Sequence, residues 1–272
     1  MKREEQIEGV SERACGMCGG KTFLYWKTAQ IIRCETCSLL SRRRFPTEDE
    51  LRELYSGSWE RPSEHCAETG ATDAEFAARY VQCLTASLGI ESLKGLRLLE
   101  FGAGTGALMR ALDAAGAEVY GVEPFGYSLL KSNGLNAFRD LSDLPACLVF
   151  DGILSQDVVE HLTEPWSVLH KFMRLLSPQG WIYLATPNAA GLNARLSRSN
   201  WRELKNPGHL TLFRPDSLEY LLRNNGFARY SRLHWQIVYG KGTIQGLKDS
   251  LLRGLKLDGE LRYLAFPSEI QS

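Results

Sequence analysis

Three glycines at alternate positions, Gly102, Gly104 and Gly106, stand where an apolar segment starting at Leu96 gives way to a helical pattern from Ala107. Glycine adopts the positive φ angles of a tight strand-to-helix turn, and without a side chain it lets a ligand approach the main chain. The first turn of a new helix also presents N–H groups that lack partners within the helix. The turn therefore has the chemistry of a site for a nucleotide-type cofactor.

A carboxylate, Glu123, ends the next apolar segment, 117–122. At that strand end it can accept hydrogen bonds from both hydroxyls of a ribose. The first two glycines together with Ala107 also satisfy the looser dinucleotide fingerprint, so the spacing alone leaves a dinucleotide and S-adenosylmethionine open. Glu100, two residues before the first glycine, and the third glycine, Gly106, favour S-adenosylmethionine.

Four of the seven cysteines form two Cys-x-x-Cys pairs, Cys15 with Cys18 and Cys34 with Cys37. Each pair places two thiolates on one tight turn, and two such turns supply the four tetrahedral ligands that zinc prefers. A zinc ion with four thiolates has no open position for water, so its expected role is structural. The isolated thiols are expected to be ordinary buried or half-buried side chains: Cys66, Cys83 and Cys147.

Around these residues, apolar strand patterns alternate with amphipathic helix patterns, which predicts an α/β fold with a mostly parallel sheet covered on both faces. The expected strands are 96–101, 117–122, 136–139, 148–155, 181–185, 228–234 and an antiparallel 259–266. The expected helices are 73–88, one from 107, 128–132, 166–176, 216–224 and 243–255, with a turn at 177–180. Because parallel sheets bind ligands at the carboxyl ends of their strands, Glu123, Asp140, Gln156 and Asn188 should meet the glycine turn in one crevice.

The N-terminal part is expected to form a small zinc ribbon with two short strands, 22–26 and 30–33. The arginine-rich run 41–46 is interpreted as a basic linker, for which a solvated face is favoured over contact with an anionic substrate. Thr47 and Glu50 are expected to form a capping box for the helix that follows. Residues 56–72 are expected to form a loop over the opening of the cofactor site. The expected division is a zinc ribbon, a helical linker with cofactor lid, and a cofactor-binding domain: 1–45, 46–92 and 93–272.

The charge balance is even, with 32 Lys and Arg against 32 Asp and Glu, so the chain offers no overall basic field for nucleic acid. The N-terminus is charged, and no apolar run approaches the roughly 18 residues of a membrane span, so neither a signal peptide nor a membrane partner is expected. Paired cysteines in an odd total favour a reducing compartment. We therefore expect a cytoplasmic protein, whose oligomeric state the sequence leaves open.

Several blocks of sequence resemble a known family. The pattern ExGxGxG at 100–106 resembles motif I of class I S-adenosylmethionine-dependent methyltransferases. DVVEHL at 157–162, followed by a helix, Pro-x-Gly and a strand closing on TPN at 186–188, is similar to the ubiquinone-biosynthesis O-methyltransferases and many small-molecule methyltransferases. GHLTLFRP at 208–215 fits the same pattern, and the ribbon looks like that of sugar methyltransferases from deoxysugar pathways. The resemblance implies a Rossmann-like, seven-stranded, mostly parallel sheet.

The resemblance also implies which residues bind the cofactor. The residues that would cradle its methionine and ribose portions are Glu100, Gly102, Gly104 and Gly106. Glu123 is implied at the ribose hydroxyls, Asp140 and Leu141 at the adenine edge, and Gln156 at the methionine end. The third-strand region departs from the family pattern, because its Asp-Leu-Pro triplet lies at 143–145.

A divalent ion is a further implication of the resemblance. In the ubiquinone-pathway relatives the matching acidic and histidine residues bind such an ion, which here implies Asp157, Glu160 and His161. Two carboxylates and an imidazole suit Mg²⁺ or Mn²⁺, which could lower the pKa of a bound hydroxyl. Capping and hydrogen bonding at a helix start is an equally open interpretation of the same residues.

Methyl transfer requires the nucleophile and the methyl group in line at about 3–3.5 Å, and a hydroxyl acceptor must also lose a proton. His161 and His209 are the candidate bases, each with a purely structural role as the alternative. A histidine base is slightly favoured over an ion, because Asp157 is shorter than the Glu at the first metal position of the relatives.

These observations together indicate a methyltransferase for a small-molecule or sugar-type acceptor, with O-methyl transfer ahead of C- or N-methyl transfer. The alternative is an RNA or other nucleic-acid methyltransferase that uses the ribbon to bind its substrate. The even charge and the absence of an Asn/Asp-Pro-Pro-Tyr motif count against that alternative. A zinc-ribbon scaffold with a vestigial cofactor fold is a third interpretation, against which the intact glycines and Glu123 argue.

Overall fold

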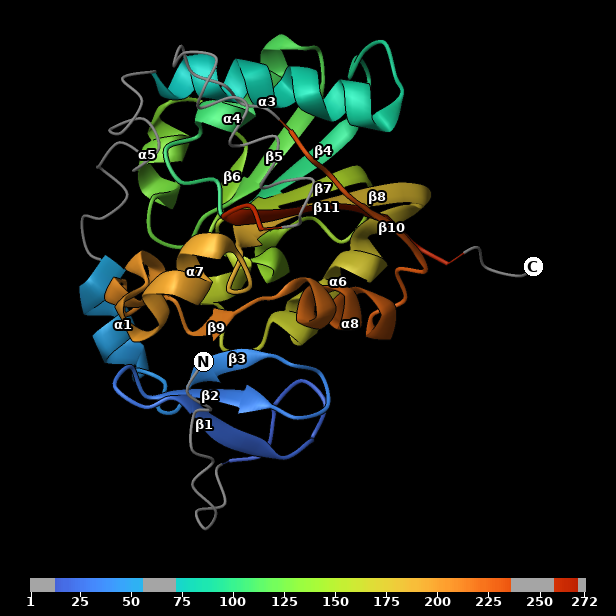
Figure 1. The fold of residues 1–272 in the computed structure, drawn as a ribbon. Coiled ribbons are helices and arrows are strands. Elements are labelled where there is room, and N and C mark those ends of the chain that lie inside the picture. Colours follow the sequence, from blue (N-terminus) through green and yellow to red (C-terminus); the bar gives the residue numbers. More distant parts are fainter. Residues whose placement is uncertain (1–12, 56–71, 236–256, 269–272) are drawn as a thin grey trace.

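The computed structural model describes residues 13–55, 72–235 and 257–268 (Figure 1). Three expectations fall outside these ranges: most of the loop at 56–72, the helix at 243–255 and the Cys66 thiol. Within them, every helix is too short or too polar to cross a bilayer.

The larger sheet has seven strands in the order β10-β11-β8-β7-β4-β5-β6. Their bounds are β4 Arg97–Phe101, β5 Glu118–Val122, β6 Ala137–Phe138, β7 Phe150–Gln156, β8 Leu176–Pro187, β10 Arg229–Arg232 and β11 Glu260–Phe266. The strands from β6 to β8 pair in parallel, whereas β11 pairs antiparallel with both β8 and β10. This arrangement confirms the predicted mostly parallel sheet and its antiparallel last strand.

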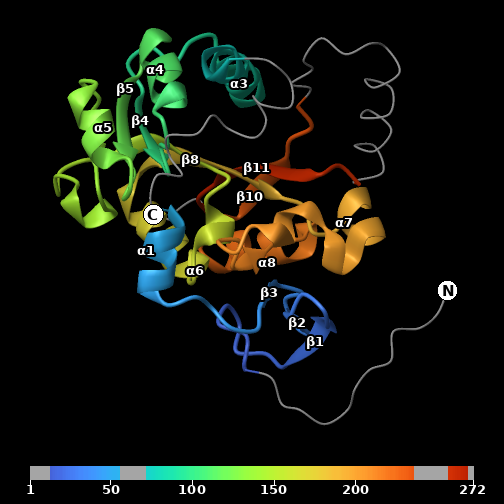
Figure 2. The same cartoon turned by 90° about the vertical axis from the view of Figure 1, so that its left-hand side faces the viewer.

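Helices cover both faces of this sheet (Figures 1 and 2). One face carries α3 (Asp73–Leu88), α4 (Ala107–Ala114) and α5 (Tyr127–Ser132), and the other carries α6 (Pro165–Leu175) and α8 (Pro215–Asn224). The remaining helices are α1 Glu48–Tyr55 and α7 Leu192–Ser197, with short 3-10 turns η2 Leu141–Asp143, η3 Val159–His161, η4 Arg198–Asn200 and η5 Arg202–Lys205.

The central strands are apolar on both sides because both faces are covered. In β8, Ile182 and Leu184 belong to the core on the α6 and α8 face, whereas Tyr183 and Ala185 belong to the core on the α3 and α4 face. All four side chains are fully buried. Truncating such a leucine or isoleucine to alanine typically costs about 2–5 kcal/mol, so these two cores hold the carboxyl ends of the strands in register.

The helix starts follow the local sequence. The predicted capping box before α1 is present: the Glu50 N–H donates to Thr47 Oγ1 at 3.3 Å, and the Thr47 N–H donates to Glu50 Oε2 at 2.7 Å. Helix α3 covers the predicted range and has a capping box of its own between Thr72 and Glu75. It ends at Gly89 in the left-handed conformation.

The turn predicted at 177–180 is wrong. These residues belong to β8, where the pairing with β7 shifts between Phe150 opposite Leu176 and Gly152 opposite Trp181. The chain therefore accommodates the Ser-Pro-Gln-Gly sequence as an irregular stretch of strand that follows α6 directly. Proline and glycine occur both in turns and in bulged strands, so their presence at 177–180 does not distinguish the two.

The ribbon forms a second sheet in the order β1-β2-β3-β9. Its strands are β1 Thr22–Trp26, β2 Ile31–Cys34, β3 Leu40–Arg42 and β9 Thr211–Leu212, each antiparallel to its neighbour. The run interpreted as a basic linker thus begins with a strand, and the last strand of this sheet comes from far along the chain. The ribbon lies against the face that carries α6 and α8 (Figure 1).

Candidate active site

The three glycines of the turn between β4 and α4 all have positive φ angles: 83° at Gly102, 50° at Gly104 and 74° at Gly106. A Cβ at Gly102 would lie 2.2 Å from Cγ2 of Val158, so that glycine is required by contact as well as by conformation. The space beside Gly104 is open, with no described heavy atom within 4 Å of its Cβ position. The turn therefore exposes main chain where a cofactor is expected.

Two carboxyl groups flank this turn. Glu123, at the end of β5, is buried and accepts from the N–H of Gly104 at 2.9 Å, of Phe125 at 3.0 Å and of Gly126 at 3.3 Å. These bonds fix the carboxylate, while its oxygens keep lone pairs for further donors. Glu100 is also buried, and burial raises its pKa to about 8. Its Oε2 has no hydrogen-bond partner within the described residues.

The other predicted cofactor residues lie at the same edge of the sheet. Asp140 follows β6 and caps η2 by accepting from the Ser142 N–H at 2.9 Å, a bond that lowers its pKa. The Leu141 side chain is buried in the core, so its main chain is the part available to a ligand. Gln156 ends β7, and its Nε2 lies 3.5 Å from Asp157 Oδ2.

A second group of polar residues lies in η3, directly after β7. Glu160 is 1% exposed, and its Oε2 accepts from the Thr186 hydroxyl at 2.9 Å. Its Oε1 is buried and makes no hydrogen bond to any described residue. Burial, reinforced by the charge of Asp157, raises the pKa of Glu160 well above its ordinary value. A buried carboxyl oxygen without a partner is unfavourable unless something else binds it.

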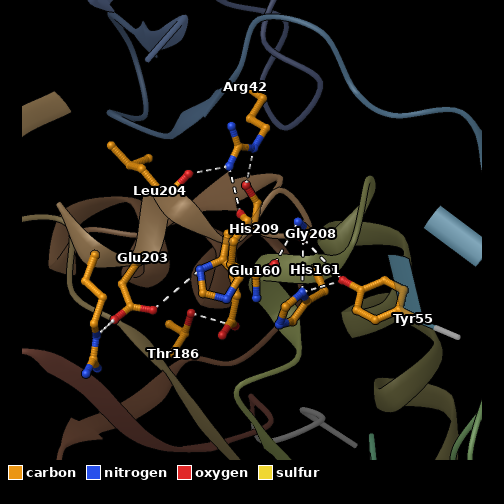
Figure 3. Close-up of polar contacts among 11 residues, drawn as sticks. Arg42, Tyr55, Glu160, His161, Thr186, Glu203, Leu204, Gly208 and His209 are labelled. Carbon is orange, nitrogen blue, oxygen red and sulfur yellow. Dashed lines mark hydrogen bonds and ion pairs between the residues drawn. The ribbon is translucent and has the colours of Figure 1, made fainter. Parts of the chain in front are cut away.

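Two histidines complete this group. One ligand atom each from Glu160, His161 and His209 lie within 4.8 Å of one another, and the two imidazole centroids are 4.6 Å apart. Figure 3 shows the rings turned toward each other beside the Glu160 carboxyl. Burial lowers the pKa of His161 to about 4, and burial together with the charges of His161 and Arg42 lowers the pKa of His209 to about 3. Both imidazoles are therefore neutral near pH 7.

The two histidines differ at their Nδ1 atoms. His161 Nδ1 lies 3.0 Å from the Gly208 carbonyl and 2.6 Å from the Tyr55 hydroxyl. His209 Nδ1 lies 3.6 Å from Glu203 Oε2 and makes no hydrogen bond to any described residue. Outer partners such as those of His161 orient histidine ligands in metal sites and leave Nε2 toward the ion. Two neutral imidazoles and one unpartnered carboxyl oxygen are therefore a suitable donor set for a divalent ion.

Asp157 is not in this group of three. Its main chain has a φ of 52°, in the left-handed region, and its N–H donates to the Ala185 carbonyl at 3.0 Å. The structure thus gathers two of the three residues implied at a divalent ion, Glu160 and His161, and adds His209 in the place expected of Asp157.

Sequence reasoning missed the residues that surround the group: Tyr55, Thr186, Glu203 and Gly208. Tyr55 comes from α1, and its ring lies 4.9 Å from that of Phe125 next to the Glu123 site. Burial and the charge of Glu160 raise its pKa to about 12. A connected path thus runs from the glycine turn through Glu123, Phe125 and Tyr55 to His161.

The four ribbon cysteines also converge, with their sulfur atoms within 4.8 Å of one another. Cys15 Sγ lies 3.6 Å from Cys37 Sγ, and Cys18 Sγ lies 3.4 Å from Cys34 Sγ. Four sulfurs about 2.3 Å from a tetrahedral zinc would be about 3.8 Å apart, which is close to these separations. Cys34 Sγ also accepts from two main-chain N–H groups, as thiolates on such turns do. The arrangement fits a structural zinc ion.

Comparison with known proteins agrees with this geometry. Residues 73–231 match the family model described as a methyltransferase domain. The chain belongs to this methyltransferase family. The matched range holds the glycine turn, Glu123 and the group formed by Glu160, His161 and His209.

Two individual proteins illustrate the similarity. A ubiquinone biosynthesis O-methyltransferase of Paracidovorax citrulli is 32% identical over 114 residues, which cover 37% of this chain and 47% of that protein. The chain thus spans about half the length of the first curated relatives it matches. An uncharacterized methyltransferase of Mycobacterium ulcerans is 27% identical over 247 residues, covering 79% of this chain and 95% of that protein.

Solved structures show the same fold. A SAM-dependent methyltransferase from Archaeoglobus fulgidus superposes with a TM-score of 0.52 at 17% identity, covering 74% of this chain and 97% of that one. An S-adenosylmethionine-dependent methyltransferase from Mesorhizobium loti gives a TM-score of 0.51 at 16% identity, covering 71% and 99%. These likenesses confirm the expected fold class.

Proposed function

We propose that this methyltransferase moves the methyl group of S-adenosylmethionine to a hydroxyl of a small-molecule or sugar-type acceptor. The observation that carries the proposal is the group of Glu160, His161 and His209 beside the glycine turn, whose Gly102 is in contact with Val158. The relatives named as ubiquinone biosynthesis O-methyltransferases support oxygen as the atom methylated. Transfer to carbon or nitrogen is the second choice.

The cofactor would lie along the carboxyl edge of β4 and β5. Gly102, Gly104 and Gly106 would hold its methionine and ribose portions, because the positive φ angles of all three shape the turn and the space beside Gly104 is open. Glu123, already fixed by three N–H groups, would accept from the ribose hydroxyls. The remaining proposed contacts are Glu100 and Gln156 toward the methionine portion, and Asp140 and Leu141 toward the adenine.

For deprotonation of the acceptor, we propose a bound divalent ion in preference to a histidine base. A general base works best with a pKa near the operating pH, whereas His161 and His209 have pKa values of about 4 and about 3. The same neutral imidazoles can bind a metal ion through an unprotonated nitrogen, and Glu160 Oε1, which has no hydrogen-bond partner among the described residues, supplies a third ligand atom. When bound, the ion would lower the pKa of an acceptor hydroxyl.

The donor set also bears on the identity of the ion. Two imidazoles and one carboxylate suit Mn²⁺, Fe²⁺ or Zn²⁺ better than Mg²⁺, which prefers oxygen ligands. Glu160 and His161 therefore remain proposed ligands, His209 takes the third position, and Asp157 has no assigned contact with the ion.

The proposal is tested by binding and by turnover with matched variants. Calorimetry should show binding of S-adenosylhomocysteine, and Mn²⁺ should bind with an affinity that Glu160→Gln lowers by at least about tenfold. Glu164→Gln, at an exposed carboxylate nearby, is the control and should change neither affinity.

Turnover should then be followed as transfer of a labelled methyl group to hydroxyl-bearing small molecules, with RNA as the competing acceptor. Chelation should abolish transfer and Mn²⁺ should restore it, with elemental analysis showing that the ribbon keeps its zinc. Methylation of RNA alone would replace the proposed acceptor class. Full turnover with chelator present and in both His161→Ala and His209→Ala would refute the ion and the histidine base together.

A further inference from the structure

Arg42, the last residue of β3, makes an unusual set of contacts with the segment that carries His209. Its Nε donates to the His209 carbonyl at 2.9 Å, and its Nη2 donates to the carbonyls of Leu204 at 3.0 Å and Asn206 at 2.7 Å. Figure 3 shows the guanidinium reaching from the ribbon to this segment. Its planar fork of donors is fixed in a geometry that holds all three carbonyls at once, whereas an ammonium group is a compact charge on a flexible stem.

The main chain of the same strand continues this connection. The Arg42 N–H donates to the Leu210 carbonyl at 2.9 Å, and Ser41 lies opposite Thr211 in the antiparallel pair of β3 and β9. On its other side, this segment reaches the candidate ion site. The Leu210 N–H donates to the Glu160 carbonyl at 2.8 Å, and the Thr211 hydroxyl donates to the Val159 carbonyl at 3.2 Å.

The zinc ligands fix the position of β3 itself. Cys34 ends β2, and its N–H donates to the Leu39 carbonyl at 2.9 Å, directly before β3 begins. Cys37, on the same turn, is buried in the core with Leu39. A zinc ion on Cys34 and Cys37 would therefore hold the start of β3 against β2. Loss of the ion would remove that support from the strand that carries Arg42.

We infer that the zinc ribbon is a positioning element for the ion site, and that Arg42 is the residue through which it places His209. The inference rests on the proposed function, since it assigns His209 to that site. Removing the Arg42 side chain would take the donor from the Leu204 and His209 carbonyls and one of two donors from the Asn206 carbonyl, and would loosen the segment 204–210 against β3. The affinity for Mn²⁺ should then fall by about 10- to 100-fold, as the loss of one or two hydrogen bonds from a charged donor predicts.

The neighbouring Arg44 provides a matched control. It belongs to the same arginine run, is largely exposed, and pairs with Glu50 on the surface at 3.0 Å. The variants to compare are Arg42→Ala, Arg42→Lys and Arg44→Ala in the full chain. Each is measured for zinc content, for S-adenosylhomocysteine affinity by calorimetry, for Mn²⁺ affinity by electron paramagnetic resonance, and for hydrogen exchange of the Leu210 and Thr211 amides.

We expect Arg42→Ala to keep its zinc and its S-adenosylhomocysteine affinity, to bind Mn²⁺ more weakly and to exchange faster at both amides. Arg42→Lys should recover part of both effects, because an ammonium can still donate to one or two of the carbonyls. Arg44→Ala should match the unmodified protein. Unchanged exchange and Mn²⁺ affinity in Arg42→Ala would overturn the inference, and so would loss of S-adenosylhomocysteine binding, which would show a general role in the fold.

The two proposals fail in different ways. If the unmodified protein binds S-adenosylhomocysteine but not Mn²⁺, the ion is excluded, and hydrogen exchange at Leu210 and Thr211 alone decides whether Arg42 places the His209 segment. If it binds neither, the proposed function fails, while the exchange comparison of Arg42→Ala with Arg44→Ala still decides the contact.

Discussion

Glu100 lies in β4, two residues before the glycine turn, and its burial makes the stability of the fold depend on pH. Its pKa is raised from 4.5 to about 8, so the folded protein binds this proton more tightly than the unfolded chain. The resulting stabilisation is fully present below pH 4.5 and is lost as pH rises through about 8. With about 1.36 kcal/mol per pKa unit, the loss between pH 5 and pH 8 amounts to about 3.5 kcal/mol.

Glu100→Gln replaces the titrating carboxyl by a neutral amide of the same shape. The stability of the variant relative to the unmodified protein should therefore rise by about 3.5 kcal/mol between pH 5 and pH 8. Urea unfolding at both pH values measures the difference, and taking that difference cancels the other titrating groups. Glu91→Gln, at an exposed carboxylate, is the control.

A difference between Glu100→Gln and the unmodified protein that stays constant from pH 5 to pH 8 would refute this reasoning. It would mean that Glu100 is ionised in the fold and that a partner satisfies its Oε2. The same experiment in saturating S-adenosylhomocysteine shows whether the ligand supplies that partner, because the pH dependence should then become weaker.

Two further predictions concern the cofactor and the ribbon. Glu123→Ala removes a charged acceptor worth about 1.5–3 kcal/mol, so S-adenosylhomocysteine affinity measured by calorimetry should fall by about 10- to 150-fold. Unchanged affinity would show that the carboxylate serves only the three N–H groups that it already binds. Elemental analysis of protein purified without chelator should find one zinc per chain. The Cys34→Ser variant should lose this zinc, and hydrogen exchange of the amides in β2 and β3 should become faster. Protein without zinc would contradict the assignment of the four cysteines.

Much of the fold follows from local sequence. The alternation of apolar strands with amphipathic helices predicts the parallel sheet, because each pattern is read within a few residues of chain. The capping box of Thr47 and Glu50 and the glycine turn are local in the same sense: a hydroxyl three residues from a carboxylate, or three glycines at positive φ, need no distant partner to define their conformation. The ribbon cysteines are also predicted by spacing alone.

The misjudged segments are those whose conformation depends on a partner. Residues 177–180 have the composition of a turn but lie in β8, because pairing with β7 holds the chain extended on both sides of the irregular stretch. Arg42 has the sequence context of a solvated linker, yet its guanidinium donates hydrogen bonds to carbonyls more than a hundred and sixty residues further along the chain. The residues next to 177–180 and to Arg42 in the sequence do not reveal either of these distant partners.

The sequence by itself predicts the kinds of site: a glycine turn with Glu123 suited to a nucleotide-type cofactor, four thiols suited to zinc, and polar residues at the strand ends suited to an acceptor. The tertiary structure alone decided which polar residues act together. His209 meets Glu160 and His161 because β9, only two residues long and without a periodic pattern of its own, is held between η3 and the ribbon strand β3. Pairing over such a distance in sequence depends on the packing of the whole domain, so short-range patterns cannot specify it.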